Sequence, residues 1–245
     1  MSSPKTLSPG NPPTALRAAL AAAETPVADR LSFGSAALDA TLPWGGLPAA
    51  RLHEIAGAAE QGVALAFAVA LLARRAADGA PPLLWGRLRR DPDRRGRPYG
   101  PGLAALGLPT ARLILVEARR PTDLLWALEE ALRAGLPAVL GEGVAADLTA
   151  GRRLQLAAER GGGLALLVPP AADRPSVSAA TTRWRVDALP LENDEFDGPA
   201  VRWRLSLERC RGGRPAQWDV VWDHATRSFA LAAELADRPL AAAAG

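Results

Sequence analysis

Apolar residues between positions 52 and 168 fall into short continuous runs, which are separated by segments long enough to form helices. The runs lie at 81–85, 113–116, 138–140 and 164–168. We expect a further short buried strand at 52–56, where His53 and Glu54 interrupt the apolar residues. Between them we expect helices over 63–77, 102–108, 121–134 and 147–160. Short strands that are apolar on both faces are typical of parallel sheets, because crossover helices cover both faces of such sheets. The pattern therefore predicts an α/β fold with a mainly parallel sheet flanked by helices.

The pattern changes after the Pro169-Pro170 pair. Apolar and polar side chains then alternate, as they do in strands with one face in solvent, at 181–186, 201–207, 218–222 and 228–231. The Arg-Gly-Gly-Arg sequence at 211–214 predicts a hairpin turn between two of these strands. We expect the four strands to extend the parallel sheet in antiparallel fashion.

The N-terminal segment has a different character from the rest of the chain. Residues 1–13 are rich in Ser, Pro and Gly without periodicity, and we expect them to be disordered. Residues 14–24 predict a short helix that needs a partner surface, with Leu16 and Leu20 as its candidate docking residues. The chain then divides into this tail and helix (1–26), a main domain (27–236) and a loose C-terminal tail (237–245).

Composition narrows the class of protein. The chain has 245 residues, of which 49% are hydrophobic and 22% charged, as in an ordinary globular domain. The single Cys210 excludes an internal disulfide framework, and one cysteine with two histidines is too few for a structural zinc site. The only lysine is Lys5, so almost all of the positive charge is on arginine. We see no secretory signal and no uncharged apolar stretch of about 18 residues, so we expect a cytoplasmic protein without a membrane span.

A degenerate phosphate-binding loop lies between the first strand and the first long helix. Gly57 and Gly62 have the G-x-x-x-x-G spacing of such a loop. A working loop continues with Lys and then Ser or Thr, which hold the nucleotide phosphates and Mg²⁺. Here Val63 and Ala64 follow, and neither can do so. We predict no catalytic residue, no cofactor and no metal; an arginine could still supply charge, so weak nucleotide binding stays open.

Two groups of arginines are candidate contacts for a partner protein or a nucleic acid. The first lies in segment 86–100, which we expect to be a mobile loop, and consists of Arg87, Arg89, Arg90, Arg94, Arg95 and Arg97. The second surrounds the predicted hairpin turn and consists of Arg209, Arg211 and Arg214. Arginines bind phosphates and acidic surfaces, and the nearby Trp203 and Trp218 could stack on bases. The alternatives are a solvated loop for the first group and strand core for the tryptophans.

The main domain resembles the RecA recombinase core at its start and the ImuA family over most of its length. The segments 34–39 (GSAALD), 45–48 (GGLP) and 54–57 (EIAG) match, in order and spacing, those that precede the RecA phosphate loop. Similarity to the ImuA family, sometimes labelled SulA-like, is carried by 102–108 (GLAALGL), 112–116 (RLILV), 123–132 (DLLWALEEAL), 148–159 (LTAGRRLQLAAE), 182–186 (TRWRV) and 209–215 (RCRGGRP).

This resemblance implies a RecA-like domain that serves as a connector in SOS mutagenesis, the bacterial translesion DNA synthesis response. The implied partners are ImuB, a Y-family polymerase relative without catalytic residues, and an error-prone replicative-type DNA polymerase. RecA is a further candidate partner, and self-association and DNA contact stay open.

Departures from active RecA agree with a protein that is not an enzyme. Arg87 lies near the place where a catalytic carboxylate is expected, and Gly141 follows the strand that should deliver an aspartate for Mg²⁺. Glu142 is the nearest acid to that position. Segment 169–180, where RecA carries a DNA-contacting loop, has Arg174 as its only basic residue.

Two other functions stay open on the sequence alone. The first is a weak ATP-binding mediator of DNA recombination, which needs an arginine in place of the missing lysine. The second is a cell-division inhibitor of the SulA type, which only the alternative family label supports. We expect Trp44, Trp85 and Trp126 to pack in the core or in an interface.

Overall fold

The structure is a computed structural model that describes residues 29–57, 61–76, 81–89, 98–171, 177–190 and 201–232. The N-terminal helix predicted over 14–24, with Leu16 and Leu20, and the C-terminal tail lie outside the described residues. The division into three segments therefore stays a prediction.

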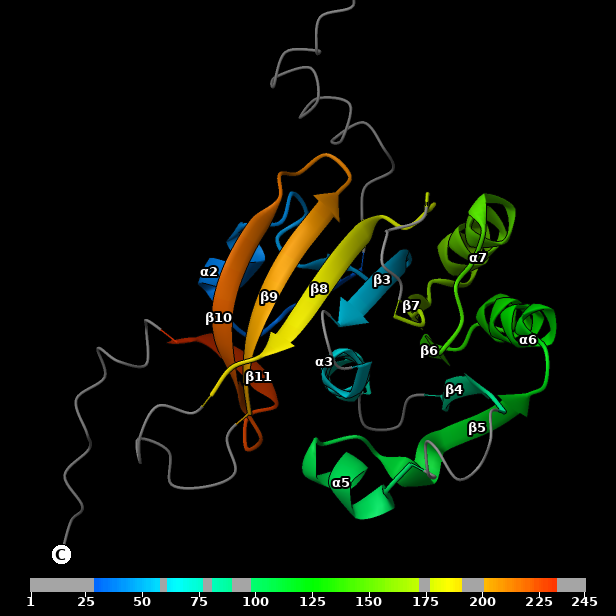
Figure 1. Ribbon diagram of the computed structural model, residues 1–245, viewed down its shortest axis with the longest axis horizontal. Helices are drawn as coiled ribbons and strands as arrows, with labels where there is room; N and C mark the ends of the chain where they lie inside the picture. The colour runs from blue at the N-terminus through cyan, green and yellow to red at the C-terminus, as the bar shows by residue number, and fades with distance from the viewer. Residues whose placement is uncertain are drawn as a thin grey trace, which may run out of the picture.

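A single large sheet forms the centre of the described chain (Figure 1). Its strands are β3 (Leu52–Gly57), β4 (Leu83–Leu88), β5 (Leu113–Ala118), β6 (Ala138–Glu142), β7 (Leu164–Val168), β8 (Thr182–Ala188), β9 (Val201–Cys210), β10 (Ala216–Asp223) and β11 (Ser228–Leu231), in the order β11-β10-β9-β8-β3-β7-β6-β4-β5. Strands β3 to β8 are parallel to one another, whereas β9, β10 and β11 are antiparallel. This confirms the α/β fold class, with one correction: β8 joins β3 in parallel and does not begin the antiparallel extension.

A small ribbon and a short helix precede the sheet. Strands β1 (Arg30–Leu31) and β2 (Leu47–Pro48) pair in antiparallel fashion, and helix α2 (Ala36–Ala40) lies between them in the chain. The Ser35 hydroxyl caps α2 by accepting a hydrogen bond from the Leu38 amide, at 3.4 Å between Oγ and N.

Helices cover both faces of the parallel part of the sheet (Figure 1). Helix α3 (Gln61–Arg75) buries its side chains in one core cluster, and α6 (Pro121–Arg133) and α7 (Leu148–Gly161) bury theirs in a second. The Glu129 carboxylate of α6 is buried, and it forms ion pairs with Arg133 of the same helix and with Arg153 of α7, the latter at 2.6 Å. Helix α5 (Gly100–Ala105) and the 3-10 turn η1 (Thr110–Arg112) connect β4 to β5.

An aromatic cluster joins α3 to the C-terminal strands. The Phe67 ring of α3 lies 6.1 Å from the Trp184 ring, 6.0 Å from Trp203 and 5.5 Å from Phe229, measured between ring centroids. Phe33 packs on the same group, and all five side chains are almost fully buried. Aromatic pairs at these separations stabilise a core beyond the area they bury.

Strand β5 is the main exception to the predicted burial. We expected a buried strand here, but β5 pairs only with β4 among the described residues and lies at the edge of the sheet. Its Ile114 is 43% exposed and its Leu115 is 44% exposed. Trp126 of α6 is 59% exposed and so is not in the core, whereas Trp85 is buried and Trp44 packs partly against the core.

No helix in the described ranges is both long and apolar enough to cross a membrane.

A neutral histidine is built into the junction between β3 and β8. The His53 ring is fully buried, with Nδ1 2.7 Å from Thr182 Oγ1 and Nε2 2.9 Å from the Pro48 carbonyl oxygen. Trp184 Nε1 donates to the same threonine oxygen at 2.8 Å. A carbonyl can only accept, so Nε2 carries the ring proton and Nδ1 accepts from the threonine hydroxyl. Burial lowers the pKa of His53 to about 4, against the opposing effect of the hydrogen bond to Pro48.

We expect this histidine to make the fold sensitive to mild acid. Between pH 6.5 and about 4 the unfolded chain binds a proton at His53 that the folded chain does not, so lower pH favours unfolding. The free energy of unfolding should fall by up to about 3 kcal/mol across this range. Urea unfolding of the wild type and of His53→Gln at pH 7, 6 and 5 measures this fall in the free energy of unfolding. Carboxylates contribute equally to the pH dependence of the two proteins, so the difference between their free energies of unfolding reports on His53 alone. An equal pH dependence in both proteins would exclude His53 as the cause.

Candidate functional site

The strand and helix predicted on either side of the phosphate loop are both present. Gly57 ends β3 and Gly62 lies in the first turn of α3, while residues 58–60 lie outside the described part. A Cβ atom added at Gly62 would meet nothing within 4 Å. Val63 packs against the core and Ala64 is fully buried in it. The two positions after the second glycine thus hold apolar side chains that contact the core.

A row of charged residues lies at the carboxyl ends of the neighbouring parallel strands. Arg87 of β4 is directly opposite Glu117 of β5 and Glu142 of β6 in the strand register. Its Nε is 3.9 Å from Glu117 Oε1 and 3.9 Å from Glu142 Oε2. We call these three residues the Glu–Arg–Glu ladder. The Arg87 and Glu142 side chains are only 10% and 12% exposed, so this pairing is largely shielded from solvent.

The position of Arg87 corrects the sequence interpretation. We expected it in a mobile loop that contacts partners, but β4 continues to Leu88 and buries Arg87. The strand can do so because acidic residues on both neighbouring strands face the guanidinium. Of the other predicted loop contacts, Arg89 is exposed just after β4. The remainder lie outside the described residues: Arg90, Arg94, Arg95 and Arg97.

Glu142, the acid nearest to the expected Mg²⁺ position, is occupied by protein contacts. Besides facing Arg87, its Oε2 accepts a hydrogen bond from Trp85 Nε1 at 3.0 Å. Within the described ranges, no cluster of three or more His, Cys, Asp or Glu side chains could hold a metal ion.

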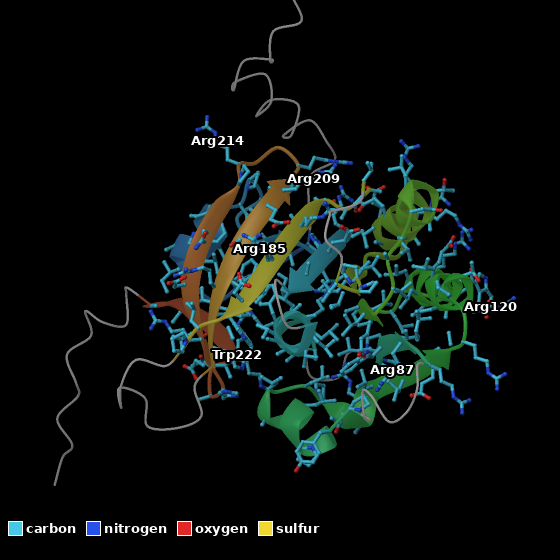
Figure 2. The ribbon with its side chains drawn as sticks, in the orientation of Figure 1. Arg87, Arg120, Arg185, Arg209, Arg214 and Trp222 are labelled. Atoms are coloured by element: carbon cyan, nitrogen blue, oxygen red, sulfur yellow. The ribbon has the colours of Figure 1, made fainter. Side chains whose placement is uncertain are left out.

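The second arginine group lies at the other end of the sheet. The hairpin turn predicted at 211–214 joins β9 to β10, and Arg209, Arg211 and Arg214 are all exposed there. Cys210 at the end of β9 pairs with Thr182 at the start of β8, so the turn lies at the amino-terminal ends of the parallel strands. Figure 2 accordingly shows Arg209 and Arg214 far from Arg87. The structure therefore separates the two groups of arginines.

The tryptophans near this hairpin belong to the core. Trp203 is 1% exposed, and Trp218 is partly buried with its ring centroid 6.1 Å from that of Trp184. Their side chains point to the face that α3 covers, because they pack in the cluster of that helix. The alternative of strand core is thus confirmed for Trp203.

An apolar surface that the sequence interpretation missed lies at the β5 edge. It consists of Ile114 and Leu115 on β5 and Trp126 on α6, and we call it the edge surface. These two elements pack against each other (Figure 1). Ile114 pairs with Leu84 and so lies on the face of the sheet that α6 covers, whereas Leu115 pairs with Trp85 and points to the opposite face. The sequence signal was available but ambiguous, since a short apolar run is equally typical of a central strand.

A buried ion pair, also missed, fixes the strand that leads into the phosphate loop. Glu54 of β3 is 6% exposed and accepts hydrogen bonds from Arg183 of β8, at 3.0 Å from Nε and 2.8 Å from Nη2. Ser178 Oγ donates to the other oxygen of the same carboxylate at 2.5 Å. Charge-assisted hydrogen bonds of this kind are about twice as strong as neutral ones. They tie β3 to β8 and to the segment before it.

Comparison with known proteins gives close relatives. No protein-family model matches the chain. Two curated proteins, each named Protein ImuA, from Caulobacter vibrioides strains NA1000 and CB 15, are 42% identical to it over 241 residues. The match covers 89% of this chain and 94% of each relative.

The Glu–Arg–Glu ladder should contribute measurably to stability. Replacing Arg87 with Met leaves the Glu142 carboxylate with little solvent and without its cation, so we expect a loss of about 2–3 kcal/mol in the free energy of unfolding. The double variant Arg87→Met/Glu142→Gln should recover part of this loss, because the amide oxygen can still accept from Trp85. Urea unfolding measures both variants. Arg120→Met, which removes an exposed ion pair with Asp123, is the control and should leave the midpoint unchanged. An Arg87→Met protein as stable as this control would contradict the assignment.

Proposed function

The chain belongs to the ImuA family, whose name places it in the ImuA/ImuB mutagenesis system, and from this premise we propose that it works there as a non-catalytic adaptor. In this proposal it links ImuB to an error-prone DNA polymerase, and RecA is a further candidate partner. It retains the frame of a nucleotide-binding domain as a scaffold for these contacts.

The observation that carries the proposal is the pair of side chains after the second loop glycine. Phosphoryl transfer depends on positioning and charge stabilisation, and the lysine and hydroxyl of a working loop supply both. Val63 and Ala64 can supply neither, and Ala64 lies in the core with no exposed surface. A hydroxyl at that position would enter an apolar cluster and require a hydrogen-bond partner there.

The Glu–Arg–Glu ladder gives this interpretation independent support. In the wild type, Arg87 faces Glu142 at the carboxyl ends of the strands, and the carboxylate also accepts from the Trp85 indole. A carboxylate already held in this way is a poor ligand for Mg²⁺, which requires near-octahedral oxygen coordination and usually keeps several waters.

The edge surface supports a docking role. An adaptor needs exposed apolar side chains that a partner can bury, and monomeric proteins rarely leave large apolar groups together without such a use. Ile114, Leu115 and Trp126 provide them. An edge strand also offers unpaired backbone groups to an incoming chain. We therefore propose the edge surface as the site where ImuB docks.

We expect the pure protein to show no saturable binding of Mg-ATP. Isothermal titration up to millimolar nucleotide should give only dilution heats, because the loop lacks the cation and the hydroxyl. A coupled assay should likewise detect no ATP turnover above a buffer blank. Submillimolar binding, or turnover that is lost when Gly62 is replaced, would instead favour the ATP-binding recombination mediator.

We also expect changes at the edge surface to weaken docking without unfolding the protein. The variant Ile114→Ser/Trp126→Ser removes two exposed apolar groups from the side of the sheet that α6 covers, so capture of ImuB in a pull-down should fall about tenfold or more. Its free energy of unfolding should fall by no more than about 2 kcal/mol, since each side chain is already about half exposed, and the variant should still unfold cooperatively.

The matched control for this experiment is Leu156→Ser on α7, whose side chain is 50% exposed but lies on a different helix. This variant should capture ImuB as well as the wild type does. Equal losses in the two variants would remove the edge surface from the proposal, and no capture by the wild type would contradict the adaptor role itself.

A further inference from the structure

The hairpin between β9 and β10 carries positive charge without nearby compensation in sequence. Segment 209–218 contains Arg209, Arg211 and Arg214 and no acidic residue. The preceding acid, Glu208, faces Arg185 of β8, with 3.3 Å between Oε1 and Nη1. The three guanidinium groups are all on exposed residues. This is a concentrated positive charge at the end of the sheet opposite the phosphate loop.

The hairpin holds these arginines on a fixed support. The Arg211 amide donates to the Thr181 carbonyl at 3.0 Å, and the Gly213 amide donates to the Cys210 carbonyl at 3.2 Å. The Arg209 guanidinium donates from Nη1 to the Ser178 carbonyl at 2.6 Å. The turn is therefore attached to the segment that precedes β8. Because the backbone of the turn and the Arg209 guanidinium are held in place before any ligand arrives, less conformational entropy is lost on binding.

The two glycines between Arg211 and Arg214 are required by the fold of the turn itself. Gly212 has a φ of 73°, a conformation that favours glycine. A Cβ atom at Gly213 would lie 2.6 Å from the Cys210 sulfur and 3.1 Å from Pro43 Cγ, so this position cannot carry a side chain without rearrangement. Between Arg211 and Arg214 the tip thus presents only backbone.

We propose that this hairpin binds the phosphodiester backbone of nucleic acid, independently of base sequence. Arginine presents a planar fork that matches phosphate oxygens, and contacts to phosphates position a protein on nucleic acid without reading its sequence. Between Arg211 and Arg214 the tip has only glycine, without an aromatic or aliphatic side chain of the kind that anchors a protein partner, which favours nucleic acid over an acidic protein surface; Val177, beside the Ser178 that Arg209 contacts, is the exposed apolar residue next to it. The inference rests on the proposed role in DNA synthesis but does not involve the edge surface.

Fluorescence anisotropy with a labelled 30-nucleotide oligo-dT and a duplex of the same length tests this proposal. Three phosphate contacts predict that the affinity for the single strand falls roughly 20-fold between 50 and 200 mM salt. The variant Arg209→Gln/Arg211→Gln/Arg214→Gln should bind at least tenfold more weakly at 50 mM salt and lose most of the salt dependence. The charge-preserving variant with Lys at the same three positions should keep most of both. The affinity for the duplex, compared with that for oligo-dT, shows whether the hairpin prefers single-stranded or double-stranded DNA.

The control variant Arg119→Gln/Arg152→Gln/Arg160→Gln removes the same charge from exposed positions just after β5 and on α7, and it should bind like the wild type. Thermal unfolding confirms that each variant is folded, and Arg214→Gln alone provides a milder change if the triple variant unfolds. The proposal would be overturned if the control variant lost as much affinity as the hairpin variant, or if the wild type did not bind at 50 mM salt. It would also be overturned if a poly-glutamate peptide of matched charge competed as effectively as nucleic acid. Capture of ImuB by the hairpin variant is measured in parallel, so failure of this inference is distinguishable from failure of the adaptor role.

Discussion

The packing of Phe67 against the aromatic side chains of the C-terminal strands is the interaction on which the rest of the structure depends. Helix α3 begins at the phosphate loop, and through Phe67 it contacts Trp184 on β8, Trp203 on β9 and Phe229 on β11. These contacts join the parallel and antiparallel halves of the sheet into one core. Close-packed interiors respond to changes of even one methylene group, so this helix is a fixed part of the core. Ala64, one turn from its start, shares that burial.

Charged side chains are buried at one end of the sheet and exposed at the other. At the carboxyl ends of the strands, Arg87 is buried against Glu117 and Glu142, and such a pair is tolerated because each charge compensates another. At the amino ends, the hairpin arginines are exposed, and their positive charge can attract an anion. The first arrangement serves the fold, whereas the second leaves a surface for binding.

The apolar edge at β5 complements this division. A strand at the edge of a sheet exposes backbone donors and acceptors, and proteins usually protect such edges with charges or with a covering segment. Within the described chain, β5 instead exposes Ile114 on the face that α6 covers and Leu115 on the opposite face, and Trp126 of α6 is exposed as well. In the proposed adaptor, the apolar edge would be available to a protein and the basic hairpin to a nucleic acid.

The sequence by itself determined the type and order of the elements in 52–168 and the hairpin turn at 211–214, because hydrophobic periodicity and turn chemistry act over a few residues. It also determined the apolar character of the phosphate-loop positions, Val63 and Ala64. Only the tertiary structure decided that β5 is an edge strand, that Arg87 is buried and that the two arginine groups lie apart. The physical reason is that the neighbours of a strand depend on where each crossover returns the chain, and burial depends on those neighbours. A local pattern of residues contains no information about which strands become neighbours or how deeply each one is buried.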